Sequence, residues 1–278
     1  YFDALTARGI AFRQINQHDK ALRDLKLCLE LASTNQRKAN TLFELSLVYV
    51  QTNDTNAAVN ALQTICDNHS DFAGMEDVLF ELGWAYSKNS QPEKASGIFS
   101  RLLETYPKSK YSGEAAYFNG QQSYAAQNFD QAIHNFQLAI SVSDDNALIE
   151  RAMYRVAWSL YNKKEYLEAD KEFSKQLRQY SETPLALDAM MMIGECRYQL
   201  KNYASALESY KIARDTILSN NDSATTIRDP SERQVREIVL LHGGQSAAQL
   251  GQWTEAIKWY DELRKRFPST NYLFSTSR

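Results

Sequence analysis

Small, bulky and polar side chains follow one another along this chain in a pattern that repeats every 37 residues. Alanines mark the repeat at Ala21, Ala58, Ala95, Ala132, Ala169 and Ala206. Twelve residues before each alanine is a small residue: Gly9, Ser46, Gly83, Gly120, Ala157 and Gly194. Four residues after each alanine is a bulky apolar residue: Leu25, Leu62, Phe99, Phe136, Phe173 and Tyr210. A period of this length is typical of a chain built from copies of one supersecondary unit.

Within each period the pattern predicts two helices of about a dozen residues, joined by a polar turn such as 127–128 or 163–165. Small side chains let the two backbones approach where the helices cross, and the bulky residue one turn later fills the groove beside the crossing. Gly120 and Ala132 represent this contact in one copy. A leucine at either position would overpack the crossing at a cost of about 1–3 kcal/mol.

A seventh copy of the pattern follows an insertion. Gly244, Ala256 and Tyr260 occupy the three columns, but Ala256 lies 50 residues after Ala206, so 13 residues have been inserted. The inserted stretch is polar and predicts a loop at 219–229. This loop is either a tolerated surface insertion or a partner-binding loop.

A helix is predicted to begin directly after the insertion. Asp229 can cap it, Pro230 suits its first turn, and Glu232 lies three residues after the cap. We therefore expect a helix that is extended at its N-terminus. The whole of 1–278 is expected to form one array, with repeats at about 2–38, 39–75, 76–112, 113–149, 150–186, 187–218 and 230–270.

The best copy of the repeat reads Leu79-Phe80-Glu81-Leu82-Gly83-Trp84-Ala85-Tyr86, followed by Ala95, Phe99, Leu102 and Pro107. It matches in order the columns of the tetratricopeptide repeat, which the chain resembles over essentially its whole length. The first two copies match less well, since Arg8 stands where leucine is expected and Leu25 and Leu62 replace an aromatic residue. The resemblance implies an all-α fold, a right-handed superhelical solenoid of about seven helix-turn-helix repeats.

The unit is longer than the 34 residues usual in this family, and the extra length falls between repeats. The segment Tyr106-Pro107-Lys108-Ser109-Lys110-Tyr111 is an example, and Phe267-Pro268-Ser269-Thr270 repeats it in part. The segment looks like bacterial cell-envelope members of the family, of the Tol-Pal coordinator and outer-membrane assembly lipoprotein types. This implies a periplasmic or envelope-associated complex. Because the chain begins with Tyr1 inside a helical pattern, we expect it to be a fragment of a longer protein.

Charge and composition exclude some classes of protein. The chain has 31 Lys and Arg against 34 Asp and Glu, a net charge of −3. This disfavours a nucleic-acid partner, because a duplex binder needs a basic face. No run approaches the roughly 18 apolar residues of a membrane span. The three cysteines fall inside helical patterns, where small core residues are expected.

The motifs of enzymes and of metal centres are missing from the sequence. It holds no glycine-rich phosphate loop, no His-Glu-x-x-His and no Cys-x-x-Cys. The four histidines are dispersed and share no helix face at metal-ligand spacing. We therefore expect no catalytic site, no metal and no cofactor, so that the chain is not an enzyme.

The resemblance implies that the first helix of each repeat lines a concave face. Residues three and four apart share one side of a helix. On that side the sequence predicts partner-binding aromatic residues at Phe80, Trp84, Tyr117, Tyr124, Tyr154, Trp158, Tyr161 and Tyr198. Acidic residues stand beside this row at Asp3, Asp77, Glu81, Glu114, Asp188 and Glu195, of which Asp77, Glu114 and Glu195 are predicted to take part in binding.

Such a face predicts a peptide or partner segment that carries Arg or Lys, held by cation–π and charge contacts. The alternatives are that these rings pack between neighbouring helices and that the carboxylates form a solvated surface. The Lys/Asn/Arg clamp of the chaperone-binding family members is missing, so capture of a C-terminal carboxylate is not expected. A structural or oligomerising element, or a regulatory domain of a larger protein, remains the alternative to an interaction scaffold.

Overall fold

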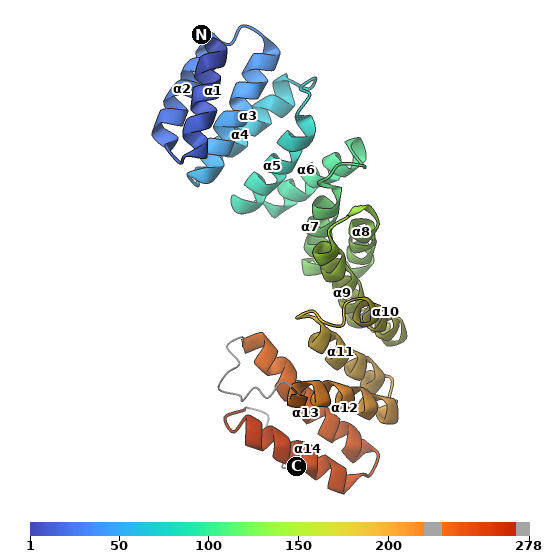
Figure 1. Cartoon of the computed structure of the whole chain (residues 1–278). Coiled ribbons are helices and arrows are strands. Elements are labelled where there is room, and N and C mark those ends of the chain that lie inside the picture. The colour runs from blue at the N-terminus through green and yellow to red at the C-terminus, as the bar shows by residue number, and fades with distance from the viewer. Residues whose placement is uncertain (220–229, 271–278) are drawn as a thin grey trace. The chain divides into compact units, whose positions relative to one another are not determined.

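The computed structural model describes residues 1–219 and 230–270, and every regular element in these two ranges is an α-helix (Figure 1). The helices are α1 (Phe2–Gln14), α2 (His18–Leu31), α3 (Asn35–Gln51), α4 (Thr55–Asn68), α5 (Met75–Lys88), α6 (Pro92–Thr105), α7 (Ser112–Ala125), α8 (Phe129–Val142), α9 (Asn146–Asn162), α10 (Tyr166–Gln179), α11 (Ala186–Gln199), α12 (Tyr203–Ser219), α13 (Pro230–Gln249) and α14 (Trp253–Arg266). The predicted all-α class is confirmed.

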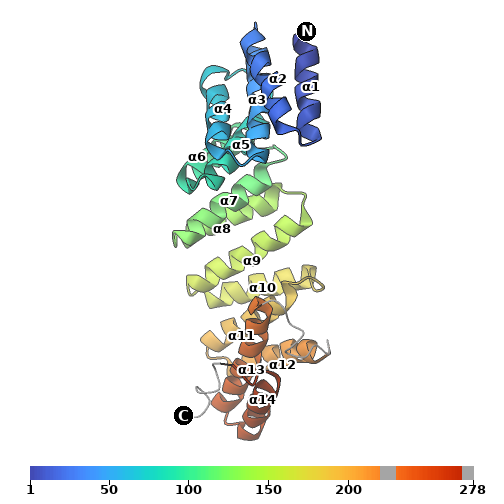
Figure 2. The same ribbon diagram turned by 90° about the vertical axis from the view of Figure 1, so that its left-hand side faces the viewer.

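The helices belong to two compact units. One unit holds Tyr1–Asn128 with Leu138–Asp144, and the other holds Phe129–Gln137 with Asp145–Arg278. In the first unit each helix from α1 to α7 packs on the next one in the chain. Figure 2 shows α1 beside α2 and α3 beside α4. The first unit is therefore a stack of helical hairpins.

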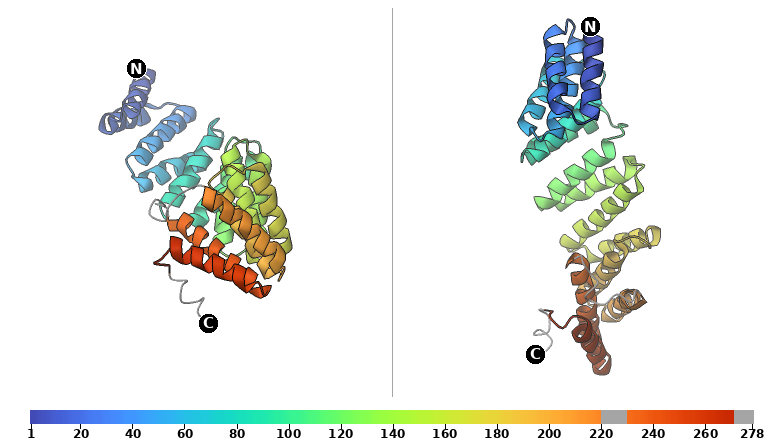
Figure 3. Two further views of the ribbon diagram at one scale, coloured as in Figure 1. Left: turned by 60° about the horizontal axis from the view of Figure 1, so that its bottom comes forward. Right: turned by 60° about the vertical axis from the view of Figure 1, so that its left-hand side comes forward.

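The second unit follows the same rule from α9 to α14, and α11 also packs on α13. Figure 3 shows α13 and α14 side by side. Helices α9, α11 and α13 are the first helices of their hairpins, so the contact of α11 with α13 joins two neighbouring repeats. Contact limited to neighbours is what defines a repeat solenoid.

The two crossing columns of the sequence pattern meet in space. A Cβ atom placed on Gly83 would lie 2.5 Å from the ring of Phe99, and one on Gly194 would lie 2.6 Å from the ring of Tyr210. Gly83 and Gly194 are buried, as are both rings. In these two hairpins the first helix thus offers bare backbone to the ring on the second helix, which explains the glycine twelve residues before Ala95 and Ala206.

The turn inside each hairpin also repeats, in a way that the apolar pattern does not reveal. One residue per turn has a left-handed backbone, with φ between 56° and 70°: Asn16, Asn53, Ser90, Gln127, Lys164, Lys201 and Gly251. The next amide donates to a carbonyl five residues back, as Asp54 does to Tyr49 at 2.9 Å. This is the Schellman motif that ends helices.

Each unit has apolar cores of its own. Buried Leu62, Leu82, Phe99 and Leu102 belong to the first unit, and buried Phe173, Tyr210 and Trp259 belong to the second, among other residues. The cysteines Cys28, Cys66 and Cys196 are free thiols and are buried, as predicted for small core residues.

Helix α13 begins at Pro230, as predicted, and its 20 residues make it longer than α11 with 14. The cap predicted at Asp229 and the loop predicted at 219–229 lie outside the described residues, apart from Ser219, the last residue of α12.

Alanine at Gly83 should lower the free energy of unfolding by about 1–3 kcal/mol, because the new methyl group would overlap the Phe99 ring at 2.5 Å. Gly97 on α6 is the matched control. A Cβ there meets no atom within 4 Å, so Gly97→Ala should raise stability by up to about 1 kcal/mol through helix propensity. Urea unfolding followed by circular dichroism measures both variants, and equal changes would contradict the close crossing.

Candidate functional site

Two predicted aromatic residues of the first unit, Phe80 and Trp84, lie on α5 and are half-buried. Their ring centroids are 6.3 Å apart in an edge-to-face arrangement. Trp84 also packs edge-on against Phe99 at 5.7 Å and against Phe118 at 5.6 Å. Phe80 stacks on Tyr111, which directly precedes α7, with centroids 4.0 Å apart. These rings therefore contact the core on one side and keep part of their surface exposed.

Asp77 lies one helical turn before Phe80 and is held by the segment between α6 and α7. The Tyr111 hydroxyl donates to Asp77 Oδ1 at 2.6 Å, and Lys110 Nζ lies 3.4 Å from the same oxygen. Burial and this hydrogen bond raise the pKa of the Tyr111 phenol. Asp77 thus already has a donor and a cation, both from the envelope-like segment 106–111, although its carboxylate is still partly open to solvent.

Helix α7 carries the other predicted residues of this unit. Tyr117 and Tyr124 lie seven residues apart on one side of α7, and both are half-buried. Glu114 lies in the first turn of the same helix and is exposed. Of the three acidic residues predicted to bind a partner, Glu114 is the most open to solvent.

In the second unit, three predicted aromatic residues form a row on α9. The Trp158 ring centroid is 6.3 Å from that of Tyr154 and 5.7 Å from that of Tyr161, in both cases edge-to-face. Tyr154 packs on the buried ring of Phe173 at 5.6 Å, and Tyr161 packs on Tyr166 at 5.2 Å. All three predicted residues are half-buried.

Glu195 on α11 occupies a different environment from Asp77 and Glu114. It is only 8% exposed, and its Oε1 atom accepts a hydrogen bond from the hydroxyl of Tyr210 and contacts Nδ1 of His242. The predicted residue Tyr198, half-buried on the same helix, stacks on His242 with centroids 6.2 Å apart. Glu195 is therefore a buried anchor between α11, α12 and α13 rather than an open surface carboxylate.

The polar cluster of Glu195, Tyr210 and His242 was not expected from the sequence. Its signal was the tyrosine at 210 in a column filled elsewhere by leucine or phenylalanine, because a buried phenol requires a hydrogen-bond partner. Burial raises the pKa of Tyr210 well above its usual value, and the Glu195 carboxylate adds to this effect. Burial, with Glu195 as a secondary cause, also raises the pKa of Tyr161 to about 12.

Residues 1–219 and 230–270 offer neither a metal-binding group nor a membrane-spanning helix. Within these ranges no group of three or more His, Cys, Asp or Glu side chains could hold a metal ion. No helix described there is both long and apolar enough to cross a membrane.

The stacked hairpins place the chain in the class of all-α helical repeat proteins. Models of the tetratricopeptide repeat match residues 77–109 and 239–270, and a second model of this repeat matches 154–221. These segments of the chain carry tetratricopeptide repeats. Repeats of this kind imply a protein–protein interaction scaffold, and proteins that carry them are generally non-catalytic and typically bind protein or peptide partners.

Solved structures support the same fold. The C-terminal part of a tetratricopeptide repeat protein from Cytophaga hutchinsonii superimposes with a TM-score of 0.70 at 14% identity, covering 98% of this chain and 99% of that one. The apo form of RapI gives 0.63 at 14% identity over 99% and 79%. YrrB, described as having an unusual peptide-binding site, gives 0.56 at 14% identity over 79% and 98%. No curated protein matches the chain in sequence.

Ionisation of Tyr161 should destabilise the fold at high pH. An unfolded tyrosine has a pKa of about 10, whereas burial raises that of Tyr161 to about 12. The stability that this group contributes is complete below about pH 10 and is lost as the pH rises towards 12, because the unfolded state releases the proton first.

Urea unfolding at about pH 9 and about pH 11.5 tests this, since Tyr161→Phe should lose less stability between the two than the wild type. Tyr1→Phe is the control, because the ring of Tyr1 is exposed. Parallel losses in the wild type and in Tyr161→Phe would show that the phenol is not desolvated in solution.

Proposed function

We propose that the chain is a non-catalytic scaffold that binds a peptide or partner segment through the aromatic side of its first helices. The proposed contacts are those predicted from the sequence: Phe80, Trp84, Tyr117, Tyr124, Tyr154, Trp158, Tyr161 and Tyr198, with Asp77, Glu114 and Glu195. The surfaces of the two units are proposed separately, each as a site of its own.

The observation that carries the proposal is the half-burial of all eight aromatic residues. Core packing alone would bury such rings fully, as it does Phe99, Phe173 and Trp259. Rings that are held rigidly by the core on one side and open on the other lose little conformational entropy on binding, which is why Tyr and Trp dominate binding surfaces. YrrB, which has the same fold, is described as binding a peptide.

The charge beside these rings supports a basic partner. Glu114 is exposed, and Asp77 keeps part of its carboxylate open although Tyr111 and Lys110 bind it. Glu195 supports the surface indirectly, since it fixes Tyr210 and His242 under Tyr198. The net charge of −3 supports a protein rather than a nucleic-acid partner.

We also propose that 1–278 forms one array of seven repeats within a bacterial cell-envelope complex. The support is the 37-residue unit and the segment Tyr106–Tyr111 that resembles envelope members of the family. The stacking of Tyr111 on Phe80 gives this segment a structural role, because Tyr111 covers part of α5.

Leucine in place of Trp84 or Trp158 should reduce partner retention at least about tenfold, since a binding aromatic residue contributes more than about 1.4 kcal/mol. Leucine keeps an apolar side chain against the core, so the helical circular-dichroism signal should persist. The immobilised chain is exposed to a lysate of the source organism, and the retained proteins are identified by mass spectrometry and then titrated.

The controls for this capture are Leu167→Ala and Ile212→Ala, which remove exposed apolar side chains from second helices. Both should retain the partner as the wild type does. Equal retention by folded Trp84→Leu, Trp158→Leu and the controls would contradict binding at the aromatic side.

An oligomerising role is the second candidate, and α14 favours it. Trp253 and Ile257 lie four residues apart on one face of this helix and are 67% and 58% exposed. If this face mediates self-association, light scattering should show a mass that rises with concentration, and Trp253→Ser/Ile257→Ser should abolish the rise. A mass of 31.8 kDa at all concentrations would exclude this role.

A further inference from the structure

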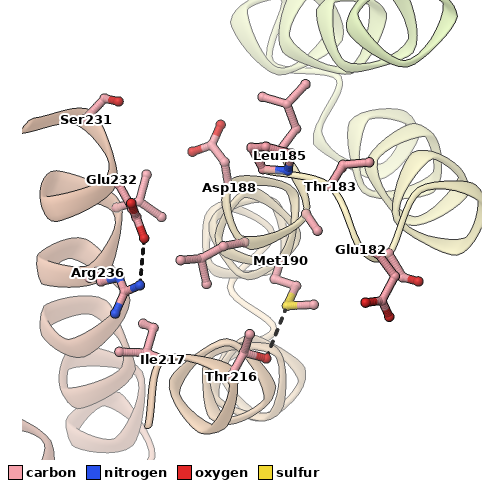
Figure 4. A pocket seen from close by; sticks show the side chains of 15 residues that line it. Glu182, Thr183, Leu185, Asp188, Met190, Thr216, Ile217, Ser231, Glu232 and Arg236 are labelled. Atoms are coloured by element: carbon pink, nitrogen blue, oxygen red, sulfur yellow. Dashed lines mark hydrogen bonds and ion pairs between the residues drawn. The ribbon is translucent and has the colours of Figure 1, made fainter. Parts of the chain in front are cut away.

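The second unit contains a cavity that the proposed aromatic contacts do not use. Its volume is about 860 Å³, within the range of small-molecule and side-chain sites. The turn 181–185 and the first residues of α11 form one wall, the C-terminal part of α12 forms the floor, and the first turns of α13 form the facing wall (Figure 4). Three successive helices of one unit thus border it, and it is partly open to solvent.

Asp188, in the first turn of α11, is the distinctive side chain of the cavity. No hydrogen bond or ion pair joins its carboxylate to any residue in the described ranges. Asp188 is half-buried, and burial raises its pKa to about 6. A desolvated carboxylate without a counter-ion is costly unless a ligand supplies the charge.

The other repeats show what is missing at Asp188. In the column that Asp188 occupies, Asp3 pairs with Arg37 at 3.4 Å, and Asp77 accepts from Tyr111. In both cases the partner stands 34 residues later, in or just before the first turn of the next hairpin. The equivalent position for Asp188, after the inserted 13 residues, is Val235.

Val235 also lines the cavity, but its side chain has no polar atom. Asp3 and Asp77 thus have a cation or a donor from this position, whereas Val235 offers Asp188 neither. Asp188 and Val235 both line the cavity, which is large enough to hold a ligand that supplies the donor.

The basic residue of the cavity is committed elsewhere. Arg236 is buried, and its Nη2 atom donates to Glu232 at 2.6 Å. Figure 4 shows this pair on α13, facing the helix that carries Asp188. Glu182 adds a further carboxylate at the exposed edge. The acidic groups outnumber the basic one, so the lining attracts a cation.

Aliphatic side chains from all three helices and from the turn before them line much of the rest, beside the hydroxyl groups of Thr183, Thr216 and Ser231. The aliphatic side chains are those of Leu185, Leu187, Met190, Ile217 and Val235. Apolar walls that end at one carboxylate match a ligand with an aliphatic stem and a cationic head.

We propose that this cavity binds a guanidinium or ammonium group on an aliphatic stem, with Asp188 as the counter-ion for the head and the apolar walls around the stem. This is the chemistry of an arginine or lysine side chain and of a free alkyl cation. The inference does not depend on the aromatic side of the first helices, because none of the eight proposed rings lines the cavity.

The probe is n-butylguanidinium, with neutral n-butylurea as its matched control of nearly the same shape. Ligand-observed NMR at roughly 20 mM probe detects the millimolar affinity expected of a fragment. The wild type should bind butylguanidinium at least about tenfold more tightly than butylurea, because the head forms a charge-assisted pair with Asp188. No binding, or equal binding of the two probes, would overturn the proposal.

Two variants locate the site. Asp188→Asn removes the charge but keeps the shape, and it should weaken butylguanidinium at least about tenfold while leaving butylurea unchanged. Glu93→Gln removes an exposed carboxylate from the first turn of α6 in the first unit and should bind like the wild type. Thermal unfolding separates binding from folding, because Asp188→Asn also removes an unpaired desolvated charge and should not lower the melting temperature. Unchanged binding by Asp188→Asn would overturn the assignment.

The pH dependence is a further readout. Only ionised Asp188 attracts the cation, so affinity should be full above about pH 7 and fall by about tenfold per pH unit well below pH 6. Glu182, Glu232 and Arg236 also face the cavity, so the profile is compared with that of Asp188→Asn, which should be flat across the same range. A wild-type profile as flat as that of the variant would contradict the role of Asp188.

The blocked tripeptide acetyl-Gly-Arg-Gly-amide distinguishes the two sources of the cation. Tighter binding than butylguanidinium assigns the cavity to a side chain of a partner polypeptide. Exclusion of the peptide while butylguanidinium binds assigns it to a free small cation. Since neither probe contacts the proposed aromatic rings, failure of the partner-capture experiment leaves this result standing, and the reverse is also true.

Discussion

The close approach of a small residue on the first helix to a bulky residue on the second is the contact on which the rest of each hairpin depends. With Gly83 against Phe99 and Gly194 against Tyr210, the two helices of a hairpin lie near enough for the ring to be fully buried. That ring then forms the platform for the next layer. Trp84 rests on Phe99, and Tyr154 rests on Phe173. The exposed aromatic edges are therefore held in place by the same crossing that defines the repeat.

The half-buried rings resolve an apparent choice between core and surface. The sequence pattern leaves open whether these rings pack between helices or bind a partner, and the structure shows that each ring packs and also remains partly exposed. Packing on one side is what makes a ring rigid enough to bind efficiently on the other. The two roles are thus parts of one arrangement.

The 37-residue spacing predicted the helices, the crossing and the buried thiols, because each depends on side-chain size at fixed intervals. It did not predict which carboxylates are already paired. Asp77 and Glu195 both stand beside the aromatic row in sequence. Asp77, however, is bound by Tyr111, which directly precedes α7. Glu195 is buried with Tyr210 and His242. Such partners come from other helices and depend on rotamers, which local spacing does not encode. The cavity at Asp188 was not predicted for the same reason, since its lining comes from a turn and three helices that meet only in the fold.

The left-handed residue in each hairpin turn has a consequence for the modularity of the chain. Asn16, Asn53 and Ser90 share the left-handed backbone conformation. After each of them, the next amide donates a hydrogen bond to the carbonyl five residues back. Because two such turns have the same conformation, the chain between them can be deleted or duplicated and the remaining ends joined with the local geometry unchanged. The length of a stack is then a variable that duplication or loss of whole repeats can alter, while insertions fall between hairpins, as the 13 residues before α13 do.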